Sequence, residues 1–201
     1  MQDFRLAELA RMIEGWPGLV SSPAEDLVAD SLVLLDHLDA ARRLIDVGSG
    51  GGLPGLALKI ARPGLEVTLV EADQDKAAFL VQASAKLKLE VEVVARRAED
   101  AGHDERYRER FDVAVARALA PMRTLVELCL PFVKVGGRLL AQKTHDEEAG
   151  HAIEVLGGRL ESVMPAPSVA RGKGVVIVVS KVAHTPAAYP RRAGVPGRRP
   201  L

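Results

Sequence analysis

The chain has 201 residues, enough for one α/β domain, alone or with a short extension. Hydrophobic residues make up 48% of it and aromatic residues only 3%, so Leu, Val and Ala must fill the core. No apolar run approaches the roughly 18 residues of a membrane span, and the N-terminal segment has no signal-peptide pattern. The single cysteine, Cys129, excludes an internal disulfide, so we expect a protein of the reducing cytoplasm.

The formal net charge is zero, with 27 Lys and Arg against 27 Asp and Glu, but the charges are unevenly distributed. No acidic residue follows Glu161. The same stretch contains seven basic residues: Arg171, Lys173, Lys181, Arg191, Arg192, Arg198 and Arg199. A basic end on an acidic body favours an anionic partner such as nucleic acid, and a tail that only increases solubility is the alternative.

Two helices are predicted before the first strand, and we assign residues 1–39 to a short N-terminal helical extension. Residues 3–14 place their apolar side chains on one helical face. A second helix should begin after Ser22, which can cap it, with Pro23 at the first helical position, and should run to about His37.

From residue 43 onward, short apolar segments alternate with helical ones. The predicted strands are residues 44–47, 67–70, 91–94, 111–115, 138–141, 160–163 and 175–179. The helices predicted between them are residues 56–60, 76–87, 121–130 and 146–156. This alternation predicts βαβ units in a mostly parallel, seven-stranded α/β sheet within residues 40–185.

The last two predicted strands differ from the others because only a Pro-rich loop separates them. Since no crossover helix fits there, we expect an antiparallel hairpin at one edge of the sheet. Residues 186–201 are rich in Pro, Gly and Arg and should form an irregular basic tail.

The loop after the first strand carries two overlapping ligand motifs in the segment DVGSGGGLPG at residues 46–55. Its second half fits G-x-G-x-x-G, the pattern of an NAD pocket, whereas the pattern from Asp46 through Gly48 and Gly50 fits D-x-G-x-G-x-G, that of an S-adenosylmethionine (SAM) pocket. Glycines permit positive φ and a close approach of ligand to backbone. Glu71, after the second strand, could bind ribose hydroxyls in either case, and a glycine-rich turn without a ligand is the third possibility.

Three features favour SAM over NAD. Asp46 lies in the strand itself, where it can orient the backbone or reach a methionine amino group. Ala98 and Glu99 follow the third strand, where a backbone N–H and a carboxylate could contact N1 and N6 of adenine; a solvated charge is the alternative for Glu99. The antiparallel hairpin also suits a methyltransferase sheet better than a second mononucleotide-binding half.

The chain resembles the 16S rRNA methyltransferase G family, also called glucose-inhibited division protein B. The matching segments are IDVGSGGGLPG (45–55), VEADQDK (70–76), RRAE (96–99), FDVAVARALAP (111–121) and the tail YPRRAGVPGRRPL (189–201). The resemblance covers roughly residues 40–201. It implies a Rossmann-like, class I SAM-dependent methyltransferase that modifies N7 of one guanine, position 527 in the 530 loop of 16S rRNA, in the small subunit or an assembly intermediate.

The resemblance also implies roles by position. Gly48 and Leu53 would line the methionine and ribose side of SAM, Glu71 would hold the ribose, and Ala98 with Glu99 would read adenine. Together with the glycine motif, the predicted cofactor residues are Asp46, Gly48, Gly50, Leu53, Glu71, Ala72, Asp73, Ala98, Glu99 and Arg117.

Guanine N7 has a lone pair and no proton to lose, so methyl transfer to it needs positioning rather than a general base. No catalytic base is evident in the sequence. Arg117, after the fourth strand, is the best catalytic candidate, because a guanidinium can stack on a base or bond to guanine O6. A structural ion pair is its alternative. We expect Cys129 to be a core residue rather than a nucleophile.

Further basic residues could contact RNA. Lys143 could meet a phosphate or be a surface lysine. The tail residues predicted to contact rRNA phosphates are Arg191, Arg192, Arg198 and Arg199. His103, His145 and His151 have no metal-ligand partners nearby in sequence, so we expect surface histidines and no metal.

The chain departs from the family pattern on the expected RNA side. Residues 1–39 are shorter than the usual helical region, Asp30-Ser31 lacks a preceding Arg-His, and Lys143-Thr144 stands where Lys-Gly is usual. Two other functions remain open: an NAD-binding oxidoreductase, and a non-catalytic rRNA-binding or assembly factor with the same fold. Nothing in the sequence indicates an oligomer, so we expect a monomer.

Overall fold

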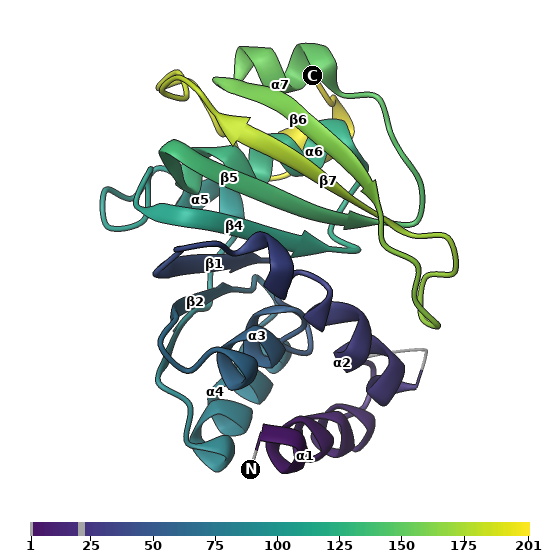
Figure 1. The fold of residues 1–201 in the computed structure, drawn as a ribbon. Helices are drawn as coiled ribbons and strands as arrows, with labels where there is room; N and C mark the ends of the chain where they lie inside the picture. The colour runs from purple at the N-terminus through teal and green to yellow at the C-terminus, as the bar shows by residue number, and fades with distance from the viewer. Residues whose placement is uncertain (1, 20–22) are drawn as a thin grey trace.

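The computed structural model describes residues 2–19 and 23–201, and within them the chain forms a seven-stranded sheet in the order β3-β2-β1-β4-β5-β7-β6 (Figure 1). The strands are β1 (Arg43–Val47), β2 (Glu66–Val70), β3 (Val91–Val94), β4 (Phe111–Arg117), β5 (Val133–Lys143), β6 (Gly158–Pro165) and β7 (Val175–Lys181). Strands β1 to β5 pair in parallel, whereas β7 is antiparallel to both β5 and β6. The predicted parallel sheet with an antiparallel edge hairpin is confirmed.

The helices fall into two groups that cover opposite faces of the sheet. They are α1 (Gln2–Glu14), α2 (Ala24–Leu32), α3 (Gly55–Ala61), α4 (Gln74–Leu87), α5 (Ala98–Ala101), α6 (Met122–Cys129), α7 (Gly150–Val155) and α8 (Val195–Arg198), with short 3-10 turns at Leu35–His37 and Leu130–Phe132. Helices α1 to α4 share one apolar cluster, and α6 and α7 belong to the other. Alternate residues of a strand feed the two clusters: Leu44 belongs to the first and Ile45 to the second.

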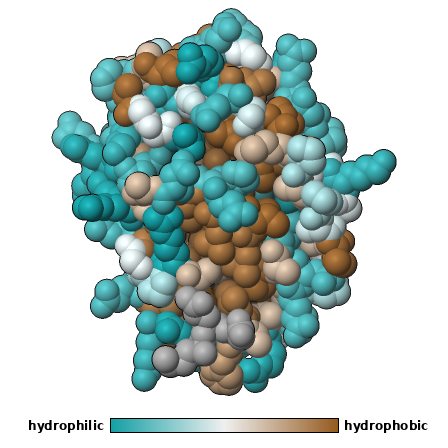
Figure 2. Space-filling view, viewed as in Figure 1, coloured by the Kyte–Doolittle hydropathy of each residue, from teal (hydrophilic) through white to brown (hydrophobic). Residues whose placement is uncertain are grey.

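The side of the molecule that faces the viewer in Figure 1 is partly apolar. Strands β5 to β7 lie in front of α6 there, and Figure 2 shows a band of hydrophobic surface on this side with polar residues along its borders. Among the described residues, no helix is both long enough and apolar enough to cross a membrane.

The N-terminal helices α1 and α2 pack against α3 and α4 rather than standing apart from the rest of the domain. Leu9 and Ile13 of α1 are fully buried in the first cluster, and the ring of Trp16 meets Phe79 of α4 edge-on, with centroids 5.3 Å apart. Lys86 of α4 also pairs with Glu8 of α1 at 2.6 Å. Apolar contact therefore joins this extension to α4.

Several predicted boundaries are wrong: β5 begins at Val133 rather than 138, and β6 extends from Gly158 to Pro165 rather than over 160–163. The second helix ends at Leu32, not near His37, and a 3-10 turn follows it. Pro23 is the residue before that helix rather than its first position, and the predicted cap Ser22 lies outside the described residues. The helix predicted over 146–156 begins only at Gly150, because Glu147 accepts a hydrogen bond from the Met122 amide at 2.6 Å and holds the preceding segment irregular.

The basic tail is more ordered than predicted. It contains the short helix α8, and Thr124 of α6 donates a hydrogen bond to the carbonyl of Pro196 at 3.0 Å. Cys129 is fully buried in the second cluster, as expected for a core residue. The division of the chain at residues 39 and 185 stays a prediction.

A buried lysine fixes the end of β7. Lys181 is fully buried; its Nζ donates to the carbonyl of Leu130 at 2.8 Å and to Thr185 Oγ1, and lies 3.3 Å from Oε1 of Glu109. Burial lowers the pKa of Lys181 to about 8, although Glu109 opposes the shift.

We expect Lys181 to make the free energy of unfolding rise with pH between about 8 and 10.5. Within this window the unfolded chain still binds a proton that the folded lysine has released, so raising the pH favours the folded state. Urea unfolding across the window should show that Lys181→Met removes a rise of roughly 2–3 kcal/mol. Lys173→Met, which replaces an exposed lysine, should keep the rise; a rise that survives in Lys181→Met would contradict this assignment.

Candidate active site

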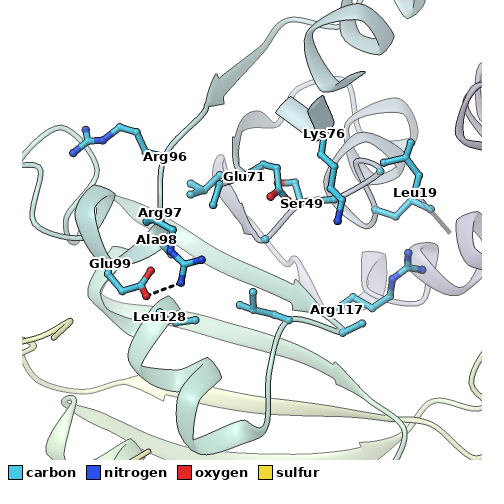
Figure 3. Close-up of a pocket in the computed structure, with 18 residues that line it drawn as sticks. Leu19, Ser49, Glu71, Lys76, Arg96, Arg97, Ala98, Glu99, Arg117 and Leu128 are labelled. Atoms are coloured by element: carbon cyan, nitrogen blue, oxygen red, sulfur yellow. Dashed lines mark hydrogen bonds and ion pairs between the residues drawn. The ribbon is translucent and has the colours of Figure 1, made fainter. Parts of the chain in front are cut away.

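A cavity of about 350 Å³ opens where the carboxyl ends of β1, β2 and β4 meet. The chain turns toward β2 and β3 after β1 but toward β5 after β4, so the cavity lies at the topological switch point, the usual ligand site of such sheets. Eight of the ten predicted cofactor residues line it: Gly48, Gly50, Leu53, Glu71, Ala72, Ala98, Glu99 and Arg117. Figure 3 shows Glu99 and Arg97 at one end of the cavity and Arg117 and Leu19 at the other.

The glycine loop forms one wall, and its conformation requires glycine. Gly48, Gly50 and Gly52 have φ values of 73°, 52° and 83°, in the left-handed region. A Cβ on Gly48 would also lie 2.5 Å from Cδ1 of Leu119. The amides of Gly48 and Ser49 both donate to the carbonyl of Val70, at 2.9 and 3.1 Å, which ties the loop to the end of β2.

Asp46 lies beneath this loop rather than in the cavity. Its carboxylate is fully buried, and Oδ2 accepts a hydrogen bond from the Gly55 amide at the start of α3, at 2.9 Å. Its other oxygen has no partner among the described residues. Burial raises the pKa of Asp46 to about 7, although the Gly55 hydrogen bond and Arg117 oppose this. Of the two roles predicted for Asp46, the geometry supports orientation of the backbone.

Glu71 joins the glycine loop to the turn after β2. Its Oε2 accepts from the Gly50 amide at 2.8 Å, and its Oε1 accepts from the Asp73 amide at 2.9 Å. A carboxylate has about four acceptor sites, so both oxygens keep capacity for ribose hydroxyls. Asp73 itself caps α4, with Oδ1 accepting from the amides of Asp75 and Lys76, and does not line the cavity.

Glu99 is held firmly at the other end. Its carboxylate is nearly buried, and Oε1 accepts hydrogen bonds from Nη2 of Arg97 and from the Gly194 amide, both at 2.8 Å. Burial alone would raise the pKa of Glu99, but these hydrogen bonds lower it below its usual value. The group is therefore an ionised acceptor at neutral pH, suited to an exocyclic amino group such as adenine N6.

Arg117 stands between this cavity and a second one of about 400 Å³. Its Nη1 donates to the carbonyl of Leu27 at 2.9 Å and lies 3.8 Å from Oδ2 of the buried Asp30. Burial lowers the pKa of Arg117, and Asp30 and Asp46 counteract the shift. Ala118, next in the chain, has a φ of 52°, a strained value for a residue with a Cβ and one that often marks functional sites.

The second cavity brings together residues that sequence reasoning missed. Asp30, Gln142 and Arg171 line it together with the predicted Lys143. Nε of Arg171 is 2.8 Å from both carboxylate oxygens of Asp30, and Gln142 donates to the Asp30 carbonyl at 2.8 Å. Asp30 was noted only as part of an Asp-Ser pair, and no local pattern indicates a partner 141 residues away. Lys76 and Arg97, which line the first cavity, were also missed, although both lie in segments that match the family.

The structure separates the predicted RNA-contact residues into two kinds. Arg192, Arg198 and Arg199 are exposed, whereas Arg191 binds the fully buried Glu127 with two nitrogens. Lys143 donates to the Ala120 carbonyl at 2.9 Å and pairs with Glu147 at 2.7 Å. His103, His145 and His151 are exposed, and the described residues hold no His, Cys, Asp or Glu cluster that could bind a metal.

The sheet order with its antiparallel β7, the glycine loop and the carboxylate after β2 agree with the class that the comparisons show, a SAM-dependent methyltransferase. Two solved structures illustrate the fold. A putative RNA methyltransferase from Pyrococcus horikoshii matches with a TM-score of 0.59 at 15% identity, over 90% of this chain and 100% of its own. Mitomycin 7-O-methyltransferase matches with a TM-score of 0.63 at 17% identity, over 79% of this chain and 55% of its own.

The chain belongs to the rRNA small subunit methyltransferase G family, whose family model matches residues 21–161. The ribosomal RNA small subunit methyltransferase G of Moorella thermoacetica is 47% identical over 184 residues, covering 87% of this chain and 76% of the relative. That of a Roseiflexus species is 49% identical over 169 residues, covering 81% and 72%.

These matches confirm the predicted family, the SAM-dependent class and an enzyme that acts on small-subunit rRNA. The NAD-binding oxidoreductase and the non-catalytic assembly factor are therefore set aside. The roles of individual site residues stay predictions, as does a monomeric state.

Gly48→Ala should weaken SAM binding about 10-fold or more, because the new methyl group would collide with the cavity-lining Leu119 and the positive φ strains the loop by about 1–3 kcal/mol. Calorimetric titration with SAM measures the change. Gly64→Ala is the matched control, since a Cβ there meets no atom within 4 Å and the residue is exposed. Equal SAM affinity in the two variants would show that the loop does not contact the cofactor.

Proposed function

We propose that this enzyme transfers the methyl group of SAM to N7 of a guanine, position 527 in the 530 loop of 16S rRNA. One observation carries the proposal beyond family membership: Arg117 lies between two adjoining cavities, so a cofactor in the first and a base in the second would meet at this residue. The specific atom and nucleotide rest on the resemblance of the motifs that surround Arg117.

The residues that line the first cavity support SAM binding there. The glycine loop lines the part of the cavity proposed for the methionine moiety, and a Cβ on Gly48 would collide there with Leu119, another lining residue. Glu71 has acceptor capacity for the ribose hydroxyls. Glu99, which is ionised, and the backbone amide of Ala98 suit N6 and N1 of adenine. Bound SAM would supply a methyl group on a positively charged sulfur.

The chain's own residues would act by positioning. The lone pair of guanine N7 forms a bond to the methyl carbon while the carbon–sulfur bond breaks, and no proton has to be removed first. Arg117 would hold the base by stacking or by bonding to O6. Among the described residues that line the second cavity, Asp30 is the one with a carboxylate. Arg171 binds both of its oxygens, which suits a fixed structural group better than a general base.

Contacts to RNA would come from residues around this site. Arg192, Arg198 and Arg199 are exposed and could neutralise phosphates, and Lys143 at the second cavity could do so if it exchanged Glu147 for a phosphate. Arg191 is a weaker candidate, because its guanidinium is bound to Glu127. Since small-subunit rRNA is made and assembled in the bacterial cytoplasm, this is the compartment we assign.

Mass analysis of the 530 loop tests the proposed product. Ribosomes from wild-type cells should contain 7-methylguanine at position 527, and ribosomes from cells lacking this gene should contain unmodified guanine there. Expression of the wild-type gene should restore the methyl group. An unchanged methyl group in the deletion strain would overturn the proposed target.

Arg117→Ala should lower the rate of methylation by about 100-fold, because the base loses the group that positions it. SAM affinity should fall less than in Glu71→Ala, since Glu71 belongs to the ribose end. Calorimetry and a single-turnover methylation assay separate the two effects, and thermal unfolding checks that both variants fold. Equal losses of SAM affinity in the two variants would instead make Arg117 a cofactor-binding residue.

A further inference from the structure

The C-terminal segment, residues 186–201, is fastened to the side of the domain that carries Glu99. Arg108 forms the first attachment point. Its Nη1 donates to the carbonyls of Gly102 and Tyr189, at 2.9 and 2.8 Å, and its Nη2 donates to the carbonyl of Thr185 at 2.8 Å. Pro190 then packs on Gly102, where a Cβ would come within 2.9 Å of its ring. The segment is therefore seated directly behind α5, the helix that begins at Ala98.

Arg191 attaches the segment at a second point, through an ion pair with Glu127. Its Nε lies 2.8 and 3.1 Å from the two carboxylate oxygens of Glu127, its Nη2 lies 2.5 Å from Oε2, and its backbone amide also donates to Oε1 at 2.8 Å. Glu127 is fully buried on α6. Since a buried carboxylate without a partner is strongly destabilising, this ion pair fixes where the segment lies.

The segment then reaches the cofactor site itself. Three residues after Arg191, the chain turns at Gly194 with a φ of 79°, and the Gly194 amide donates to Oε1 of Glu99 at 2.8 Å. Nη2 of Arg97 donates to the same oxygen. Gly194 itself is not one of the residues that line the cavity. Two donors on one oxygen fix the orientation of the Glu99 carboxylate. Neither of these two donors contacts the other oxygen, Oε2.

We propose that the C-terminal segment is a positioning element of the cofactor site, which sets Glu99 for recognition of the adenine amino group. This inference rests on the SAM site of the proposed function. A fixed, ionised carboxylate accepts a hydrogen bond from the N6 amino group but repels the oxygen that replaces it in hypoxanthine. If Arg191 is lost, the Gly194 amide is no longer held against Glu99, and the carboxylate can turn away from the base. Selectivity for adenine would then fall.

The test compares two ligands, S-adenosylhomocysteine and its deaminated analogue S-inosylhomocysteine, by calorimetry. The wild-type protein should prefer the adenine ligand by about 100-fold or more. Arg191→Met should narrow this ratio about 10-fold, mainly through weaker binding of the adenine ligand. Glu99→Gln, which removes the carboxylate charge, shows how far the affinity ratio falls when recognition of the adenine amino group by Glu99 is lost. Arg159→Met, which replaces an exposed arginine on β6, should keep the wild-type ratio.

The ratio of the two ligand affinities distinguishes a positioning role of Arg191 from a purely structural one. If Arg191→Met weakens both ligands by the same factor, or changes neither, the inference is overturned. Arg191→Lys provides a milder second variant, because it keeps the charge but cannot bind Glu127 with two nitrogens, and it should give an intermediate ratio. If the wild-type protein binds neither ligand, the SAM site and this inference are overturned together. If the wild-type protein discriminates between the ligands but Arg191→Met and Arg191→Lys keep the full affinity ratio, only the role of the tail is overturned.

Discussion

The chain that leaves β1 has to turn within a few residues, pass the end of β2 and start α3, in a mostly buried environment. It does so through backbone conformations with positive φ at Gly48, Gly50 and Gly52. The carbonyl of Val70 and the carboxylate of Glu71 then take up the amides that this turn leaves unpaired. The glycine loop and Leu119 both line the cavity. A side chain at Gly48 would strain the backbone and also collide with Leu119.

A second physical feature is the use of buried ionic groups to fix the positions of segments at the edges of the domain. Arg171 binds Asp30 and connects the β6–β7 loop to α2, Arg191 binds Glu127 and connects the tail to α6, and Lys181 lies against Glu109 at the end of β7. With aromatic residues at only 3% of the chain, irregular segments have few large side chains with which to anchor themselves. Such pairs add little stability over apolar packing, but each penalises any other placement of its segment, because a lone buried charge is costly.

Periodicity and motif spacing predict most of the sheet and the wall of the cofactor cavity, because both depend on local sequence. A buried parallel strand is a short apolar run, and a turn with positive φ requires glycine, so β1 and its loop can be recognised without tertiary information. The failures occur where distant contacts override local preference. Residues 146–149 are helix-compatible, yet Glu147 is held by the Met122 amide, 25 residues earlier. Asp30 gives no local sign that it faces Arg171, because only the folded sheet brings the β6–β7 loop over α2.

The charge pattern along the sequence likewise does not show which basic residues are paired within the folded protein. Seven basic residues after Glu161 suggest a surface for nucleic acid, but a count along the chain treats all seven alike. In the folded protein Arg171, Lys181 and Arg191 face buried or partly buried carboxylates, and their charge is largely neutralised within the protein. Lys173, Arg192, Arg198 and Arg199 remain exposed. Since only uncompensated charges release counterions from RNA on binding, the salt dependence should reflect the second group rather than all seven. The tail thus combines an inward arginine that fixes its place with outward arginines free for phosphate contacts, while Tyr189 and Leu201 pack against the second apolar cluster and add to its attachment.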